Sequence, residues 1–132
     1  MRNRLVFMFV AAGFVAGVTA SAHHSTAALY DESKQIRIEG RLVQFSFRSP
    51  HSFVAVEAPD EDGQMQRWAV GWNAARQLAA QGITRDFFKP GDQVVVTGNP
   101  GRDPRDHIIR MESIYRESDG FEWGNRPDEV FD

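Results

Sequence analysis

From Gln35 onward, apolar and polar residues alternate along the chain in the way that β-strands require. The first apolar series changes parity once, from Ile36, Ile38 and Leu42 to Phe45 and Phe47. Because successive side chains of a strand point to opposite faces, a change of parity requires an inserted residue or a bend. Gly40 lies within the same stretch, so the pattern predicts one long, strongly coiled first strand, as a small barrel requires.

Four more strands and one helix follow in the pattern. The strands are predicted at 51–57, 64–72, 94–98 and 108–115, where β-branched and aromatic residues concentrate. After the third strand, Asn73 can cap a short helix that ends before Gly82, a residue suited to a left-handed helix end. Three strands, a helix and two strands is the order of the OB-fold. The sequence therefore predicts an all-β chain with one short helix, an OB-fold-like five-stranded Greek-key barrel; a half-open β-sandwich is the alternative.

The first 22 residues have the pattern of an export signal. A basic start is followed by an apolar run, Leu5 to Val18, and by small residues at Ala20 and Ala22. The alternative is a retained membrane anchor, but the run of about 14 residues is shorter than the roughly 20 that a membrane-spanning helix needs. We therefore expect cleavage after Ala22 and a periplasmic or secreted protein without a stable membrane anchor.

The predicted organisation has four parts. They are a signal peptide at 1–22, a mature N-terminal segment at 23–34, an OB-like barrel domain at 35–118 and an acidic tail with aromatic residues at 119–132. Part of the tail is expected to dock on the barrel, because apolar rings interrupt its charges.

Charge and cysteine content narrow the classes of partner. The whole chain has a formal net charge of −3, and removal of Arg2 and Arg4 with the signal makes the mature protein more acidic. The remaining basic residues are scattered among acids, whereas nucleic-acid binding needs clustered Lys and Arg. No nucleic-acid partner is therefore expected. The absence of cysteine excludes disulfides and thiolate metal sites.

Histidines supply the strongest candidate chemistry. Cleavage after Ala22 makes His23 the amino-terminal residue, whose amine and imidazole can chelate one metal ion. His24 adds a second imidazole, and His51, fixed by the preceding proline, is a third candidate. Nitrogen donors in a roughly square arrangement favour copper or nickel, with zinc possible in tetrahedral geometry. The sequence predicts a copper site made by His23, His24 and His51, with nickel or zinc as alternatives.

Other interpretations of these residues stay open. A terminal histidine pair can be merely solvated, and His107 is expected to face solvent at the entrance of the last strand. Trp68, Trp72 and Phe47 form a candidate ligand-binding surface, although the two tryptophans at strand spacing also suit a core. No nucleophile-elbow motif or phosphate-binding loop is present, so no catalytic residue is assigned.

Several short motifs resemble a known family. They are "HHS" at 23–25, "PHS" at 50–52, the tryptophan of the third strand, "KPGDQVVVTGNPGRD" at 89–103 and "ESDG" at 117–120. Together they resemble small secreted bacterial proteins catalogued as domain of unknown function 6152, over nearly the whole mature chain. The resemblance implies a fold and an exported location and carries no established activity.

Three functions follow as expectations. The first is an exported periplasmic protein that binds a metal ion, with copper as the expected metal, through its mature N-terminal histidine and without catalytic turnover. The alternative is a metal-free OB-type module that binds a small molecule, sugar or peptide in the cell envelope. The third is a small envelope protein that contacts a protein partner through its acidic tail.

Overall fold

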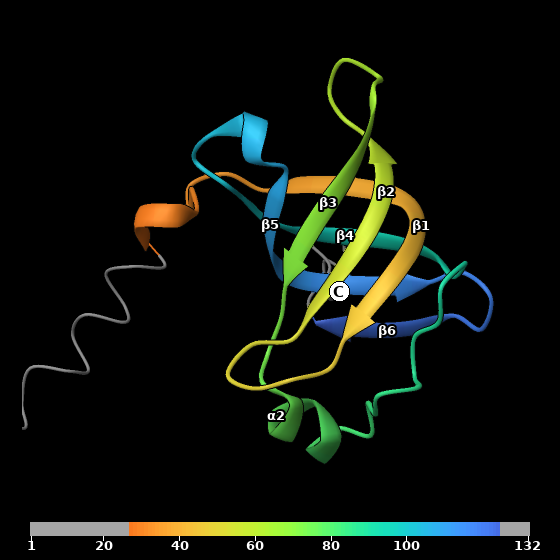
Figure 1. Ribbon diagram of the computed structural model, residues 1–132. Helices are drawn as coiled ribbons and strands as arrows, with labels where there is room; N and C mark the ends of the chain where they lie inside the picture. The colour runs from red at the N-terminus through yellow and green to blue at the C-terminus, as the bar shows by residue number, and fades with distance from the viewer. Residues whose placement is uncertain (1–26, 125–132) are drawn as a thin grey trace, which may run out of the picture.

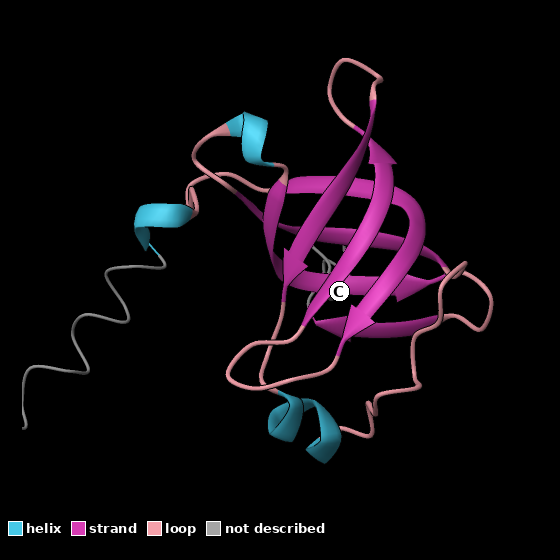
Figure 2. Cartoon of the chain, viewed as in Figure 1, coloured by secondary structure: helices cyan, strands magenta, loops and turns pink. Residues whose placement is uncertain are grey.

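The computed structural model describes residues 27–124, and the chain there is mostly β-strand with a few short helices (Figure 2). In chain order the elements are β1 (Ile36–Ser46), β2 (Phe53–Pro59), β3 (Met65–Gly71), α2 (Ala75–Ala80), β4 (Gln93–Pro100), the 3-10 turn η1 (Pro104–Asp106), β5 (Ile108–Arg116) and β6 (Phe121–Gly124). The predicted all-β class and the order of the first five strands are confirmed. Within the described residues, no helix has the length and apolar character needed to span a bilayer.

Five strands close into a barrel (Figure 1). The sheet order is β3-β2-β1-β4-β5-β6, and an additional pairing joins β3 to β5. That closing pair is parallel and short, with Ala69 opposite Ile108 and Gly71 opposite Arg110, whereas the other pairs are antiparallel. The closure brings the start of β5 beside the second half of β3, which matters for the site described below.

The coiled first strand has the predicted irregularity. Its first half pairs with β4 and its second half with β2, and the register with β2 shifts between Leu42 and Gln44. This bulge is the parity change expected from the sequence. A Cβ atom at Gly40 would lie 2.0 Å from the backbone oxygen of Glu57, so only glycine permits the close approach of β1 and β2 there.

The core fills the barrel and continues beneath α2. Its fully buried side chains include Leu42, Val54, Val56, Val70, Val96, Ile109 and Ile114. Leu78 is the buried residue of α2, and Gly82 ends the helix region with φ of +82° as predicted. The residue that caps α2 is Ala74 rather than Asn73, whose backbone oxygen instead accepts a hydrogen bond from the Ser52 N–H.

A sixth strand, β6, lies within the predicted tail. It pairs antiparallel with the second half of β5, and Phe121 and Trp123 pack against the core. The sequence prediction of a docked tail did not include this strand. Because only four residues take part, their alternation is too short to be recognised without the partner strand.

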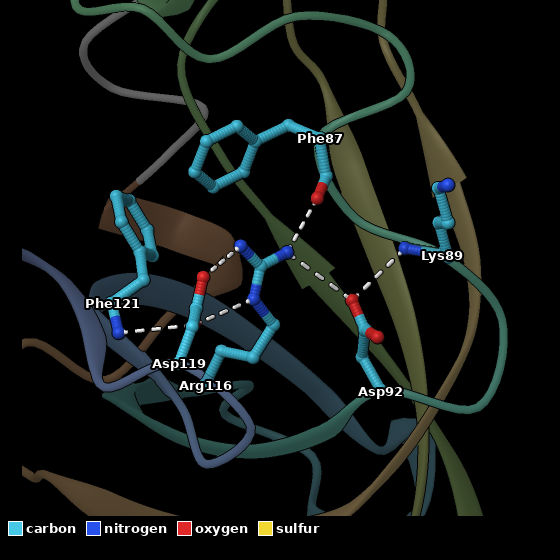
Figure 3. Close-up of polar contacts among 6 residues, drawn as sticks. All are labelled: Phe87, Lys89, Asp92, Arg116, Asp119 and Phe121. Carbon is cyan, nitrogen blue, oxygen red and sulfur yellow. Dashed lines mark hydrogen bonds and ion pairs between the residues drawn. The ribbon is translucent and has the colours of Figure 1, made fainter.

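Arg116 fastens the β5–β6 turn to the connection between α2 and β4 (Figure 3). Its side chain is 11% exposed and donates two hydrogen bonds to Asp119, 3.0 Å from Nε and 2.7 Å from Nη2. Nη1 donates to the Phe87 backbone oxygen and lies 3.3 Å from Asp92 Oδ2. The guanidinium also lies within 6 Å of the rings of Phe87, Phe88 and Phe121. The hydrogen bonds from Arg116 lower the pKa of Asp119 to about 2.

Candidate functional site

A groove of about 830 Å³ opens at the end of the barrel where the β2–β3 and β4–β5 connections lie, at the top and upper left in Figure 1. Its apolar lining includes Ile36, Ile38, Trp68, Pro100 and Ile108. Charged side chains also line it, including Lys34, Arg37, Asp60, Glu61, Asp62, Arg102, Asp103 and Arg105. A concave site with an apolar lining and a few polar groups in a barrel mouth is a common place for ligand binding.

His107 and Asp60 face each other in this groove. The His107 Nε2 atom lies 3.9 Å from Asp60 Oδ2, and the two side chains are 22% and 17% exposed. This distance is too long for a direct hydrogen bond. The expectation that His107 faces solvent is thus only partly met, because its ring also packs edge-on against Trp68 with 5.0 Å between ring centroids.

Local hydrogen bonds hold Asp60 in place. Its Oδ1 accepts hydrogen bonds from the backbone N–H groups of Asp62 and Gln64, both at 2.9 Å, and Oδ2 accepts from Gln66 Nε2 at 3.0 Å. The Gln66 bond is the main cause that lowers the pKa of Asp60, with the two backbone bonds and the nearby His107 acting in the same direction. Asp60 is therefore a carboxylate of fixed orientation, and it stays ionised at lower pH than an ordinary aspartate does.

Most bases of the groove already have acidic partners. Lys34 Nζ lies 3.5 Å from Asp31, and Arg37 Nη2 lies 3.2 Å from Glu39. Arg105 donates two hydrogen bonds to Asp103 and lowers the pKa of that carboxyl to about 2. The fixed negative charge of Asp60 faces His107 rather than one of these bases, so the interior of the groove suits a cation better than an anion.

The first described residues are fastened beside the same groove. Arg102 Nε donates to the Ala27 oxygen and the Arg102 backbone N–H donates to the Leu29 oxygen, both at 2.9 Å. Tyr30 forms a β-bridge with Gly101. The described chain therefore begins against the β4–β5 connection, one of the two connections that border the groove (Figure 1).

The predicted metal-binding histidines fall into two groups. His23 and His24 lie outside the described residues. His51 is exposed in the β1–β2 connection, which lies beside α2 (Figure 1) and is joined to that region by a hydrogen bond from the Ala75 N–H to the Arg48 oxygen. Among residues 27–124, no three His, Asp or Glu side chains are grouped as a metal site. His51 is therefore not part of such a group in the described part of the chain.

The three predicted ligand-binding aromatic residues do not form one surface. Trp68 is 7% exposed, lines the groove and donates from Nε1 to the Ala58 oxygen at 3.2 Å. Trp72 is 4% exposed and packs against Phe45, Phe88 and Trp123 near α2. Phe47 is half-buried beside Phe45, with the Arg85 guanidinium 5.8 Å from its ring centroid. Only Trp68 is thus available at the groove, while the other two contribute to an aromatic cluster.

A second, smaller groove of about 590 Å³ is lined by residues of β1, β4 and β5. The buried hydroxyls of Thr97 and Ser113 bond each other at 2.5 Å in its lining. Acidic side chains at its edge include Glu39, Glu117 and Glu122. The groove lacks a histidine or a tryptophan among the side chains that line it, and we give it no assigned role.

Sequence comparison identifies the family. The model of a family of unknown function, DUF6152, matches residues 12–110, which is more than half of the chain. The chain therefore belongs to this family, as the short motifs suggested. A comparison with curated proteins finds no significant match.

Proposed function

We propose that this member of a family without an assigned activity is exported and binds a metal ion, copper first, through its mature amino terminus. Cleavage after Ala22 supplies the amine and imidazole of His23, and His24 supplies a second imidazole. These are nitrogen donors of the kind that copper prefers. The protein acts as a carrier or buffer, without catalytic turnover.

One structural observation supports this proposal above others. Residues 27–30 are held to the barrel by Arg102 and by the bridge between Tyr30 and Gly101. A metal bound by His23 and His24 is then three or four residues from a fixed point of the fold. Burial raises the pKa of Tyr30, whose side chain lies half-buried on the barrel and adds to this attachment.

The test uses the mature protein that begins at His23. Calorimetric titration measures its affinity for Cu(II). The same titration is carried out on a protein that has Gly-Ser-Gly-Ser before His23, and the two affinities are compared. The extension moves the free amine away from the imidazole, so we expect at least about tenfold weaker binding. Equal affinity of the two proteins, or an exported product whose mass shows another first residue, contradicts the proposal.

A second function is supported by the groove itself. A metal-free module would bind a small molecule in the barrel mouth, with Trp68 as its apolar contact and Asp60 as its charged contact. This function predicts that small amines protect the Cu-free protein against thermal unfolding. It also predicts that Asp60→Asn removes the protection, whereas the Gly-Ser-Gly-Ser extension does not.

A further inference from the structure

We propose that the end of the barrel beside α2 is a docking surface for an acidic segment of a partner protein. Three exposed arginine side chains form it, and we call them the arginine surface: Arg48, Arg76 and Arg85. They belong to the β1–β2 connection, to α2 and to the residues just after α2, which lie together at the lower end of the molecule in Figure 1. The proposal involves no metal ion and is independent of the proposed function.

Contacts between these segments bring the three arginines together. The Ala75 N–H donates to the Arg48 oxygen at 3.0 Å, which places the start of α2, and with it Arg76, beside the β1–β2 connection. The Arg85 guanidinium lies 5.8 Å from the ring centroid of Phe47, which precedes Arg48 in the chain. One partner segment can therefore contact all three side chains.

The arginine surface has no acceptors for its N–H groups within residues 27–124. Each of the other arginines in that range donates to an oxygen or lies within 4 Å of a carboxylate. They are Arg37, Arg41, Arg67, Arg102, Arg105, Arg110 and Arg116. Arg48, Arg76 and Arg85 make no such contact with the described residues. Their N–H groups are therefore available to a partner.

Two of the three guanidiniums are held on aromatic rings. Arg48 lies over Phe53, 5.0 Å from the ring centroid, and Arg85 lies over Phe47. The buried Ser52 hydroxyl also fixes the backbone of Arg48, because it accepts from the Arg48 N–H at 3.1 Å and donates to the Arg48 oxygen at 3.0 Å. Side chains ordered before binding lose less conformational entropy when a partner docks. The paired N–H groups of a guanidinium match the two oxygens of a carboxylate, so the surface fits Asp and Glu side chains.

The distribution of charge favours an acidic partner at this end. The connections at 47–52 and 72–92 contain four bases and two acids, and one of these acids, Asp92, lies 3.3 Å from Arg116. The β2–β3 turn at the groove end, residues 60–64, instead contains three acids and no base. This polarity attracts an acidic segment to the arginine surface and repels it from the groove, so it favours one orientation of the partner.

The side chains at this end favour a protein segment over a membrane or a nucleic acid. The large exposed apolar side chains among residues 27–124 are Leu29 and Met65, and neither belongs to this end, whereas binding to a membrane surface relies on apolar side chains beside the basic ones. Phe47 and Phe53 are half-buried with a guanidinium over each ring, which leaves no open platform for a nucleobase. Arginine and aromatic residues together are typical of protein interfaces.

The test uses the metal-free mature protein at low ionic strength, with a fluorescently labelled oligoglutamate peptide as the probe. The double variant Arg48→Gln/Arg85→Gln removes two charges from the arginine surface. The matched control, Arg41→Gln/Arg67→Gln, removes the same charge from exposed positions on β1 and β3. Circular dichroism and thermal unfolding verify that both variants are folded. Fluorescence anisotropy measures the affinity for the peptide, and co-sedimentation measures binding to phosphatidylglycerol vesicles.

We expect Arg48→Gln/Arg85→Gln to weaken peptide binding at least about tenfold and the control to weaken it less than about twofold. If the first variant does not fold, Arg76→Gln compared with Arg67→Gln decides. Absence of peptide binding to the original protein overturns the inference, and so does an equal loss in both variants, which would reflect net charge alone. Vesicle binding that only Arg48→Gln/Arg85→Gln removes also overturns it, because the surface would then serve a membrane. Self-association that the same variant removes would assign the surface to a second copy of the chain and has the same consequence.

Discussion

Trp68 and Trp72 offer a matched pair for testing how the barrel is stabilised. Both are almost fully buried, 7% and 4% exposed, and both belong to the β3 region of the core. They differ in one respect: Trp68 Nε1 donates to the Ala58 oxygen at 3.2 Å, whereas Trp72 Nε1 finds no hydrogen-bond partner among residues 27–124. Replacing each by phenylalanine should therefore have different consequences.

The magnitudes follow from two contributions. Trp→Phe removes about 40 Å³ of side chain, and at about 24 cal/mol per Å³ of cavity this costs about 1 kcal/mol at either position. Trp68→Phe also loses a hydrogen bond, worth about 1 kcal/mol more. Trp72→Phe removes a buried donor whose lack of a partner costs about 1–3 kcal/mol, so its net effect is near zero or stabilising. The two free energies of unfolding should differ by about 2 kcal/mol or more.

Urea unfolding of the mature protein, followed by circular dichroism, measures both variants under the same conditions. We expect a clearly lower midpoint for Trp68→Phe and a midpoint close to the original for Trp72→Phe, with equal slopes. If Trp72→Phe is as destabilising as Trp68→Phe, its N–H has a partner and the reasoning is refuted. The T-shaped contact of Trp72 with Trp123, 5.1 Å between centroids, is the first place to look for one.

Two further predictions concern Arg116 and the glycine at the first strand. Arg116→Lys cannot form the paired bonds to Asp119, so Tm should fall by roughly 5–10 °C. Because the pKa of Asp119 is lowered from 3.8 to about 2, its contribution to folding stability is present above pH 3.8 and is lost as the pH falls towards 2. Calorimetry in that range should show that Tm changes less with pH in the variant than in the original protein. An unchanged dependence of Tm on pH contradicts the assignment. In Gly40→Ala the new Cβ atom would lie 2.0 Å from the Glu57 oxygen, so the free energy of unfolding in urea should fall by about 3 kcal/mol or more. Gly63→Ala is the control: its Cβ atom has free space, and the loss should be about 1 kcal/mol. A larger loss for Gly63→Ala than for Gly40→Ala contradicts the argument.

The barrel was predictable because its signals are local. The parity change between Leu42 and Phe45 marks the bulge of β1, and Gly82 marks the end of the helix region. Each feature depends on the backbone preference or the side-chain direction of a few neighbouring residues. Strand β6 escaped prediction because its stability depends on β5 and on the Arg116 contact with Asp119, which local alternation does not encode.

The candidate site depends on contacts between distant parts of the chain, which explains why the sequence did not reveal it. Asp60 belongs to the β2–β3 turn and His107 to the residue before β5, and the parallel pairing of Ala69 with Ile108 brings them together. No periodicity in the sequence predicts the short parallel pairing of β3 with β5 or the left-handed backbone conformation of His107. The sequence argument selected His51 because of its adjacent proline, a local feature. The structure gives His107 a carboxylate neighbour in Asp60 and a supporting ring in Trp68, and neither contact follows from a local sequence pattern.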